Sequence, residues 1–261
     1  MYSNWHYHES GTGETLVLLH GIGMSHAAWM PVIPYLAKHR RVIAFDLAGF
    51  GQSPALPDGL EPTMENLANV LRENLQRLGI QTPVHLAGNS LGGHLALVAA
   101  KRGVAKSVVA LSPGGLWKTK HAPRRVHHIL KLTRFSVKYL PRLSHALLGT
   151  GMGRTLALGL PMSSQASKIP SDQARQTAEI FAAARSFDST IANATRFTGG
   201  SEIEVPVTVA FGTRDWLLSS DCQYRDQLPS QTRWLRPKAW GHVPMWDEPA
   251  AVAQLILDSS T

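Results

Sequence analysis

The sequence predicts an α/β fold in which a mainly parallel sheet is covered by helices on both faces. Short apolar runs, such as residues 15–19 and 107–111, have the length of buried strands. They alternate with stretches of helical periodicity such as residues 63–78, and this alternation indicates βαβ units. With 261 residues, of which 44% are hydrophobic and 17% charged, the chain can bury one large core.

The strands and helices follow from the positions of the apolar runs and turn residues. The predicted strands are residues 2–8, 15–19, 41–45, 84–87, 107–111, 205–211 and 233–236. The predicted helices outside the interval 116–200 are residues 63–78, 94–102, 219–227 and 249–258. Glycine-rich or proline-rich turns separate most of these elements, as expected for connections at the ends of strands.

The alternation breaks between residues 116 and 200, where only helical patterns occur, for example at 126–139 and 173–187. We therefore expect a core formed by residues 1–115 and 201–261, and an inserted helical cap, or lid, formed by residues 116–200. The glycine-rich run 149–153 is expected to be a flexible loop of this cap, since it lacks the preceding strand and acidic partner of a dinucleotide site.

The stretch Gly88-Asn89-Ser90-Leu91-Gly92-Gly93 lies between a predicted strand and a predicted helix. A serine in such a tight turn has a strained backbone, and side chains two residues to either side would collide, so glycine is needed at 88 and 92. The turn would hold the Ser90 hydroxyl out at the edge of the sheet, in front of a helix N-terminus. Serine also begins helices simply as an N-cap, so the pattern alone does not establish that Ser90 is a nucleophile.

A serine hydroxyl needs a base, and the base needs a group that orients it. Asp215 follows the predicted strand 205–211, and His242 follows the last strand, so both belong to the same edge of the sheet as Ser90. The order Ser90, Asp215, His242 is one of the known chain orders of a catalytic triad. Two further acids, Asp221 and Asp226, are rivals for Asp215, but they fall within a predicted helix.

A developing oxyanion is usually held by two backbone N–H groups. The N–H of Leu91, directly after the nucleophile, is one candidate. Ile22 is the other, because Gly21 and Gly23 beside it let the backbone approach a substrate closely. His20, just before this loop, is expected to be a structural hydrogen-bonding residue below it.

Over nearly its whole length the chain resembles the α/β-hydrolase superfamily. The motifs that carry the resemblance are His20-Gly21, Asp46-x-x-Gly49-x-Gly51-x-Ser53, the 88–93 turn, Asp215 and Gly241-His242-x-Pro244. The resemblance implies a sheet of about eight strands and a Ser-His-Asp triad. Members that carry aspartate at the turn, the dehalogenases and epoxide hydrolases, are excluded by Ser90. The 88–93 turn is similar to those of both esterases and carbon–carbon bond hydrolases.

The function that follows is a serine hydrolase, of carboxylesterase type, that cleaves small-molecule esters without a cofactor or a metal. A carbon–carbon bond hydrolase, a thioesterase, a lipase and a ligand-binding receptor that retains the triad remain alternatives. Five apolar side chains near the ends of the motifs or in the cap are candidates for the substrate pocket, although each could equally pack in the core: Trp117, Met162, Phe187, Trp216 and Val243.

The net charge of +8 is unevenly placed, because no acidic residue occurs between Glu73 and Asp172. A solvated basic cap surface is the expected explanation, with weak attraction to an anionic lipid or substrate as the alternative. No nucleic-acid-binding motif is present, so no nucleic-acid partner is expected. The single cysteine, Cys222, and the absence of an apolar leader or membrane span favour a soluble, cytoplasmic protein. The oligomeric state stays open.

Overall fold

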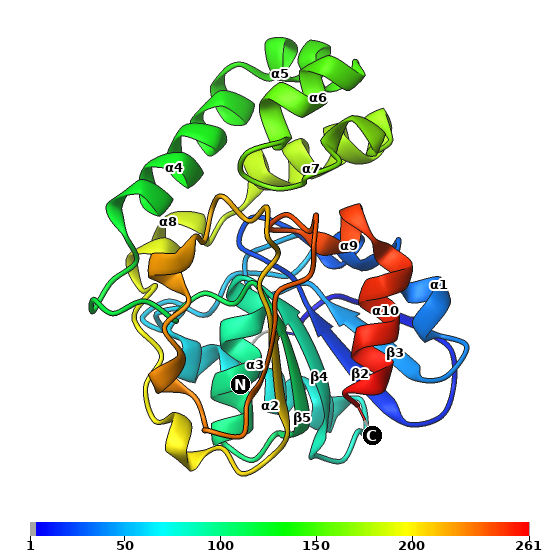
Figure 1. Ribbon diagram of the computed structural model, residues 1–261, viewed down its shortest axis with the longest axis vertical. Coiled ribbons are helices and arrows are strands. Elements are labelled where there is room, and N and C mark those ends of the chain that lie inside the picture. Colours follow the sequence, from blue (N-terminus) through cyan, green and yellow to red (C-terminus); the bar gives the residue numbers. More distant parts are fainter. Residues whose placement is uncertain (1–3, 261) are drawn as a thin grey trace.

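A computed structural model describes residues 4–260 as a seven-stranded sheet flanked by helices (Figure 1). The strands are β1 (Tyr7–Ser10), β2 (Thr15–Leu19), β3 (Arg41–Phe45), β4 (Val84–Asn89), β5 (Ala105–Leu111), β6 (Val207–Ala210) and β7 (Arg233–Leu235). Their order across the sheet is β1-β3-β2-β4-β5-β6-β7. Only β1 runs antiparallel to its neighbour, and the remaining pairs are parallel.

Successive residues of the central strands face opposite sides of the sheet, as the two-residue period of a strand requires. On one side, Val17 and Leu19 pack with α2 (Met64–Arg77) and α3 (Leu91–Lys101). On the other side, Leu16 and Leu18 belong to a second core. That second core packs with the 3₁₀-helix η1 (His26–Trp29), α1 (Ile33–Leu36), α9 (Pro244–Asp247) and α10 (Pro249–Asp258). The fully apolar runs in the sequence therefore reflect strands that are buried on both faces.

The structure confirms the α/β class and the mostly parallel sheet, with small differences in the elements. Seven strands form among the described residues, where the resemblance implied about eight. The first strand begins at Tyr7 instead of residue 2, and residues 2 and 3 lie outside the described residues. The expected helix 219–227 is two short 3₁₀ turns, η4 (Ser220–Cys222) and η5 (Arg225–Gln227).

Between β5 and β6 the chain forms five α-helices, the α4–α8 segment, of which α4 to α7 lie at the upper end of the molecule in Figure 1 and α8 lies below them. They are α4 (Arg124–Tyr139), α5 (Pro141–Leu148), α6 (Gly151–Leu158), α7 (Ser171–Ala183) and α8 (Phe187–Ala192). None of the helices formed by residues 4–260 is long and apolar enough to cross a bilayer.

Two expectations about this segment were wrong. The predicted helix 173–187 is broken into α7 and α8, because the N–H groups of Arg185 and Ser186 turn away and donate to the carbonyl oxygen of Gly49, at 2.9 and 3.3 Å. The run 149–153, expected to be a flexible loop, contains the start of α6. The Thr150 hydroxyl accepts a hydrogen bond from the Gly153 N–H and so caps that helix.

Candidate active site

Ser90 stands in a strained turn between β4 and α3, with φ 53° and ψ −112°. A Cβ atom added at Gly88 would lie 2.2 Å from the carbonyl oxygen of Gly92. A Cβ atom added at Gly92 would lie 2.1 Å from the carbonyl oxygen of Leu19, on the neighbouring strand. The two glycines are therefore required by sterics, and the strain at Ser90 is held in place by the surrounding backbone.

Backbone hydrogen bonds fix this turn to the next strand. The Ser90 N–H donates to the carbonyl oxygen of Leu111 at 2.9 Å, and the Ser90 carbonyl accepts from the N–H of Gly114 at 3.0 Å. The side chain of Asn89, which sequence reasoning did not single out, donates to the carbonyl oxygen of His242 at 2.8 Å. Asn89 thus ties the Ser90 turn to the loop that carries His242.

Asp215 and His242 meet at the carboxyl ends of β6 and β7. The His242 Nδ1 lies 3.0 Å from Asp215 Oδ2, and both side chains are buried. Asp215 Oδ1 also accepts a hydrogen bond from the Leu218 N–H at 2.8 Å. Burial alone would raise the pKa of Asp215, but the charge and hydrogen bond of His242 and the Leu218 N–H hold that pKa below its ordinary value. The carboxylate is therefore ionised and orients the ring so that Nε2 is left for another partner.

The rival acid Asp221 does not share this geometry. It is half exposed and pairs with Arg125. The second rival, Asp226, lies in the η5 turn at the surface. Of the three acids that sequence reasoning considered, Asp215 is the one that the structure brings to His242.

The loop that carries His242 is held by a carboxylate that sequence reasoning missed. Asp247 Oδ2 accepts a hydrogen bond from the Gly241 N–H at 2.5 Å, and its Oδ1 accepts from the Ser163 hydroxyl at 2.5 Å. The Val243 N–H donates to the carbonyl oxygen of Met162 at 2.7 Å. These bonds fix the histidine loop to the connection between α6 and α7 of the α4–α8 segment. No local signal marks the contact of Asp247 with Ser163, because the two residues are 84 positions apart in the sequence.

The loop after β2 lies beside Ser90. A Cβ atom on Gly21 would be 3.4 Å from the Ser90 Cβ, so this backbone passes directly by the Ser90 turn. The N–H groups of Ile22 and Leu91 donate no hydrogen bond to any of residues 4–260. Both are therefore available to an oxyanion at the site where Ser90 would attack.

The same loop contacts His20 on one side and Phe181 on the other. His20 Nε2 accepts a hydrogen bond from the Leu47 N–H at 2.9 Å, so the ring donates through Nδ1 to the Gly21 carbonyl, 2.7 Å away. On the other side, Gly23 has φ +75°, and a Cβ atom there would lie 2.0 Å from the ring of Phe181 in α7. Sequence reasoning missed Phe181, which places α7 against the loop after β2.

A small apolar cavity of about 50 Å³ opens beside Ser90. It is lined from the core by Ile22, Leu91 and Met64 and from the other side by Val126 and Leu130 of α4. In this conformation the cavity is small, and it is the smaller of the two apolar cavities described for residues 4–260. Residues of the core and residues of the α4–α8 segment therefore both line this cavity.

The five candidate pocket residues fall in different places. Trp117 lines the cavity beside Ser90. Met162 lines a second apolar cavity, of about 290 Å³, within the α4–α8 segment. Phe187 is fully buried against the Phe181 ring, Val243 is fully buried, and Trp216 is 61% exposed. These three side chains line neither cavity.

Two buried histidines, His20 and His94, predict a loss of stability on acidification. Burial lowers the pKa of each ring to about 4, from 6.5. The unfolded chain takes up these protons near pH 6.5 and the folded chain only near pH 4. Their contribution is therefore complete above pH 6.5 and decreases as the pH falls from 6.5 to 4. At about pH 5 each ring should lower the free energy of unfolding by about 2 kcal/mol.

Urea unfolding of the wild type and of His94→Leu, measured from neutral pH to pH 4, checks this expectation. Leucine cannot be protonated, so the variant should lose less free energy of unfolding on acidification than the wild type does. Parallel curves for the two proteins would contradict the assignment of that loss to His94.

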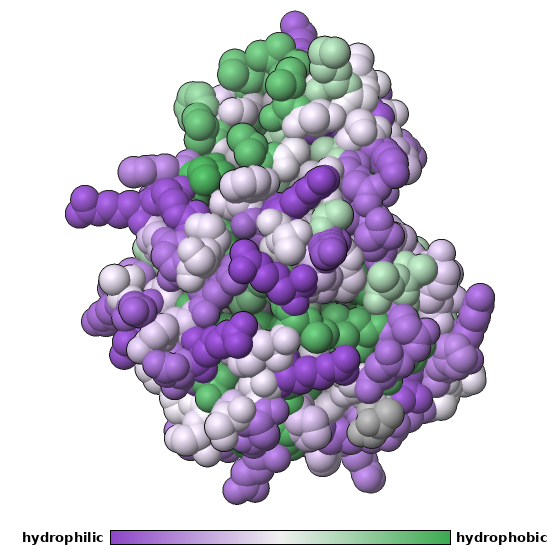
Figure 2. Space-filling view, viewed as in Figure 1, coloured by the Kyte–Doolittle hydropathy of each residue, from purple (hydrophilic) through white to green (hydrophobic). Residues whose placement is uncertain are grey.

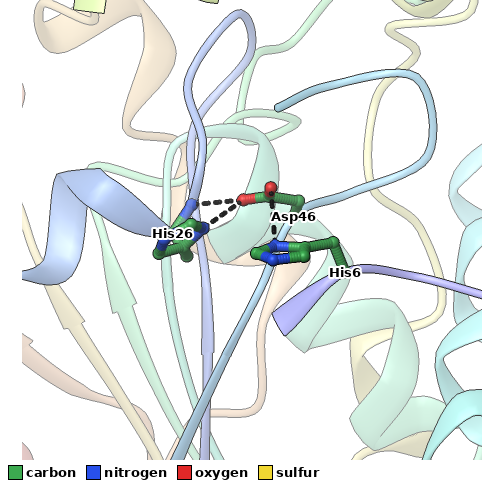
Figure 3. Close-up of side chains that lie close together, drawn as sticks. All are labelled: His6, His26 and Asp46. Atoms are coloured by element: carbon green, nitrogen blue, oxygen red, sulfur yellow. Dashed lines mark hydrogen bonds and ion pairs between the residues drawn. The ribbon is translucent and has the colours of Figure 1, made fainter. Parts of the chain in front are cut away.

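A second group of side chains, His6, His26 and Asp46, lies close together (Figure 3). Their possible ligand atoms lie within 4.8 Å of one another, a grouping that the sequence did not reveal. Asp46 Oδ1 accepts from the N–H of His26 and contacts its Nδ1, at 2.6 and 2.8 Å. Oδ2 accepts from the Gln52 N–H at 2.9 Å and contacts His6 Nδ1 at 3.2 Å. Both oxygens are occupied by these donors, so the carboxylate joins the segment just before β1, the η1 helix and the loop after β3.

Comparison with known proteins places this arrangement in context. The model of the alpha/beta hydrolase fold family matches residues 14–249. The chain is 37% identical over 121 residues to (E)-2-((N-methylformamido)methylene)succinate hydrolase of Acinetobacter baylyi, covering 46% of this chain and 44% of the relative. It is 40% identical over 90 residues to 2-hydroxy-6-oxo-6-(2'-aminophenyl)hexa-2,4-dienoic acid hydrolase of Metapseudomonas resinovorans, covering 33% and 30%.

Among solved structures, a bacterial membrane phospholipase A superposes with a TM-score of 0.76 at 24% identity, covering 98% of this chain and 86% of that one. This likeness concerns the fold. The matched stretches span less than half the length of either curated relative. The comparisons therefore support a hydrolase of this fold and leave the bond that it cleaves to be argued from the site.

Proposed function

The chain belongs to the α/β-hydrolase fold family, and we propose that it is a serine hydrolase of carboxylesterase type, which cleaves carboxylic esters through an acyl-enzyme intermediate. The observation that carries the proposal is the convergence of four connections at one edge of the sheet. The strained turn presents Ser90, the loops after β6 and β7 present the buried Asp215–His242 pair, and the loop after β2 presents a free N–H group.

In the first half of the reaction, His242 Nε2 accepts the Ser90 proton as Oγ attacks the ester carbonyl carbon. Asp215 holds the ring in the required tautomer and stabilises the imidazolium that forms. The N–H groups of Ile22 and Leu91 donate to the oxyanion, and removing one such donor typically costs about 3 kcal/mol of transition-state stabilisation. The imidazolium then gives its proton to the leaving alkoxide, and the acyl group stays on Ser90.

In the second half, His242 takes a proton from water, and the resulting hydroxide attacks the acyl carbon. Collapse of the second tetrahedral intermediate returns the proton to Ser90 Oγ and releases the acid. Every group that these steps need is a residue of the chain itself. The proposal therefore includes no cofactor and no catalytic metal.

The test is a panel of chromogenic esters that differ in acyl length, measured with the purified wild type and with Ser90→Ala. Turnover by the wild type, strongest for short acyl groups because of the small cavity, supports the proposal. A wild type that binds esters but turns none of them over would favour the alternative of a receptor that retains the triad.

Residues 116–200 form the lid of this enzyme and limit the acyl group. Support comes from α4, whose Val126 and Leu130 line the cavity beside Ser90. It also comes from Phe181, which packs on the loop that carries Ile22. Truncating Leu130 to alanine enlarges the cavity from the lid side. We expect kcat/KM for hexanoyl relative to acetyl esters to rise about ten-fold, the effect of a few methylene groups in an apolar pocket.

The matched control for Leu130→Ala is Leu143→Ala, which changes an exposed leucine of α5 that lines neither cavity. A thermal melt accompanies both variants, because truncating a buried leucine typically lowers stability. If Leu130→Ala folds and leaves the acyl preference unchanged, while Met64→Ala on the core side alters it, the lid does not set the acyl length.

A second candidate, hydrolysis of a carbon–carbon bond, is favoured by one feature of the cavity. Thr190 Oγ1 is buried, lines the cavity beside Ser90 and has no hydrogen-bond partner among residues 4–260. A plain alkyl acyl chain leaves such a group unsatisfied, whereas an acyl group with its own polar atom does not. The hydroxy-oxo-dienoic acid named for one relative has polar groups and no ester, so its hydrolysis breaks a carbon–carbon bond. Turnover of that acid, with none of the esters, would select this candidate.

A further inference from the structure

Three consecutive helices of the α4–α8 segment turn large apolar side chains toward solvent. On α4 these are Leu132, Phe135 and Tyr139, at 66%, 54% and 61% exposure. Their spacing of three and four residues places them on one face of the helix. The buried residues of α4, Val126 and Leu130, lie on another face. The helix is therefore apolar on two sides, and only one of them is covered by the protein.

The same pattern repeats on the next two helices. Exposed leucines stand at 140, 143 and 147, and Met152, Leu156 and Leu160 follow at intervals of four, exposed by 67–78%. Among the described residues, nine of the twelve exposed large apolar side chains fall within residues 132–160. Figure 2 shows apolar atoms gathered at the end of the molecule where Figure 1 places α5 and α6. Single exposed leucines are ordinary, but such clustering on one face indicates an interaction surface. We call residues 132–160 the apolar face.

The charge around the apolar face has one sign. Lys131, Lys138 and Arg142 are exposed and adjoin exposed apolar residues in sequence. No acidic residue occurs from 74 to 171. Acidic side chains reach this part of the chain from α7 and α8, where Glu179 pairs with His145 and Asp188 pairs with Arg134.

We propose that the apolar face docks on an anionic phospholipid surface, with its leucine, methionine and aromatic side chains in the interfacial layer and its lysine and arginine side chains on the head groups. Lipid accepts protruding apolar side chains without a matching shape, and its head groups supply the negative charge that the face lacks. The long stems of Lys131 and Lys138 let their charges reach the head groups while the apolar neighbours insert.

A second copy of the chain is a poorer occupant. Pairing two of these faces would bring together two surfaces of the same positive charge, with no acid from 74 to 171 to compensate them. The proposal is independent of the proposed ester hydrolysis, because it rests on the surface of α4–α6 and uses none of the triad residues. Binding and turnover can therefore succeed or fail separately.

The experiment is co-sedimentation of the full chain with vesicles of equal parts phosphatidylcholine and phosphatidylglycerol, beside vesicles of phosphatidylcholine alone. The wild type should bind the anionic vesicles more tightly, and added salt should weaken that binding. The double variant Met152→Ser with Leu156→Ser, exposed on α6 and outside both cavities, should reduce partitioning by about ten-fold or more. Met30→Ser, an exposed methionine elsewhere, should bind like the wild type.

A second variant, Lys131→Glu with Arg142→Glu, separates charge from apolar contact. It changes exposed residues only, so it should fold normally and lose the preference for anionic vesicles. Sedimentation velocity of each protein without lipid reports self-association. Absence of wild-type binding to anionic vesicles would overturn the proposal. So would a wild-type dimer that the Met152→Ser and Leu156→Ser changes convert to a monomer without altering vesicle binding.

Discussion

Replacement of Ser90 by alanine is expected to lower kcat for an ester by roughly a million-fold while leaving the fold intact. The hydroxyl supplies the attacking oxygen, and neither His242 nor the backbone N–H groups can replace it. Only a half-exposed Oγ is removed, and alanine keeps the same strained φ, so the melting temperature should change little. Ester hydrolysis and a thermal melt, recorded on the same preparation, test both parts.

The matched control for Ser90→Ala is Ser219→Ala, which removes a surface hydroxyl that bonds Asp221. This variant should keep wild-type turnover. Folded Ser90→Ala protein with wild-type activity would refute the nucleophile assignment, whatever the other residues do.

The second largest effect is expected for Asp215→Asn, about ten-thousand-fold in kcat. The asparagine amide can donate to His242 Nδ1, which moves the ring proton to Nε2. In that tautomer the ring cannot accept the Ser90 proton, although the geometry hardly changes. The side chain is buried and the Leu218 N–H still finds the asparagine oxygen, so the protein should fold.

Asp221→Asn is the control for this change, because it neutralises the rival acid six residues away and alters an exposed ion pair with Arg125. We expect nearly full activity, since exposed ion pairs contribute little. If Asp221→Asn abolished turnover and Asp215→Asn did not, the acid that orients His242 would be Asp221.

The parts of the structure that could be predicted are those set by local sequence. Gly88 and Gly92 mark the turn because any Cβ there would collide with neighbouring backbone. The strands at 15–19 and 41–45 stand out because burial on both faces leaves continuous apolar runs. Asp215 and His242 could be selected because each follows a predicted strand, and parallel strands end at the same edge.

The parts that could not be predicted depend on contacts between distant residues. Nothing near Asn89 indicates that its amide reaches the carbonyl of His242, and nothing near Asp247 indicates that its carboxylate accepts from the Ser163 hydroxyl. The break between α7 and α8 is set by the carbonyl of Gly49, far earlier in the chain. The pattern that suggested a pocket role for Phe187 is equally that of a core residue, and in the structure the ring is fully buried.

The central claim, that Ser90 is the nucleophile of an acyl-transfer reaction, is tested most directly by covalent labelling. The wild type is treated with a fluorophosphonate, and the modified residue is identified by peptide mass spectrometry as ester hydrolysis is followed. The account predicts a single adduct, on Ser90, that forms in proportion to the loss of activity and is absent from Ser90→Ala. An adduct on a different residue that accompanies the loss of activity, or full turnover with Ser90 completely labelled, would contradict it.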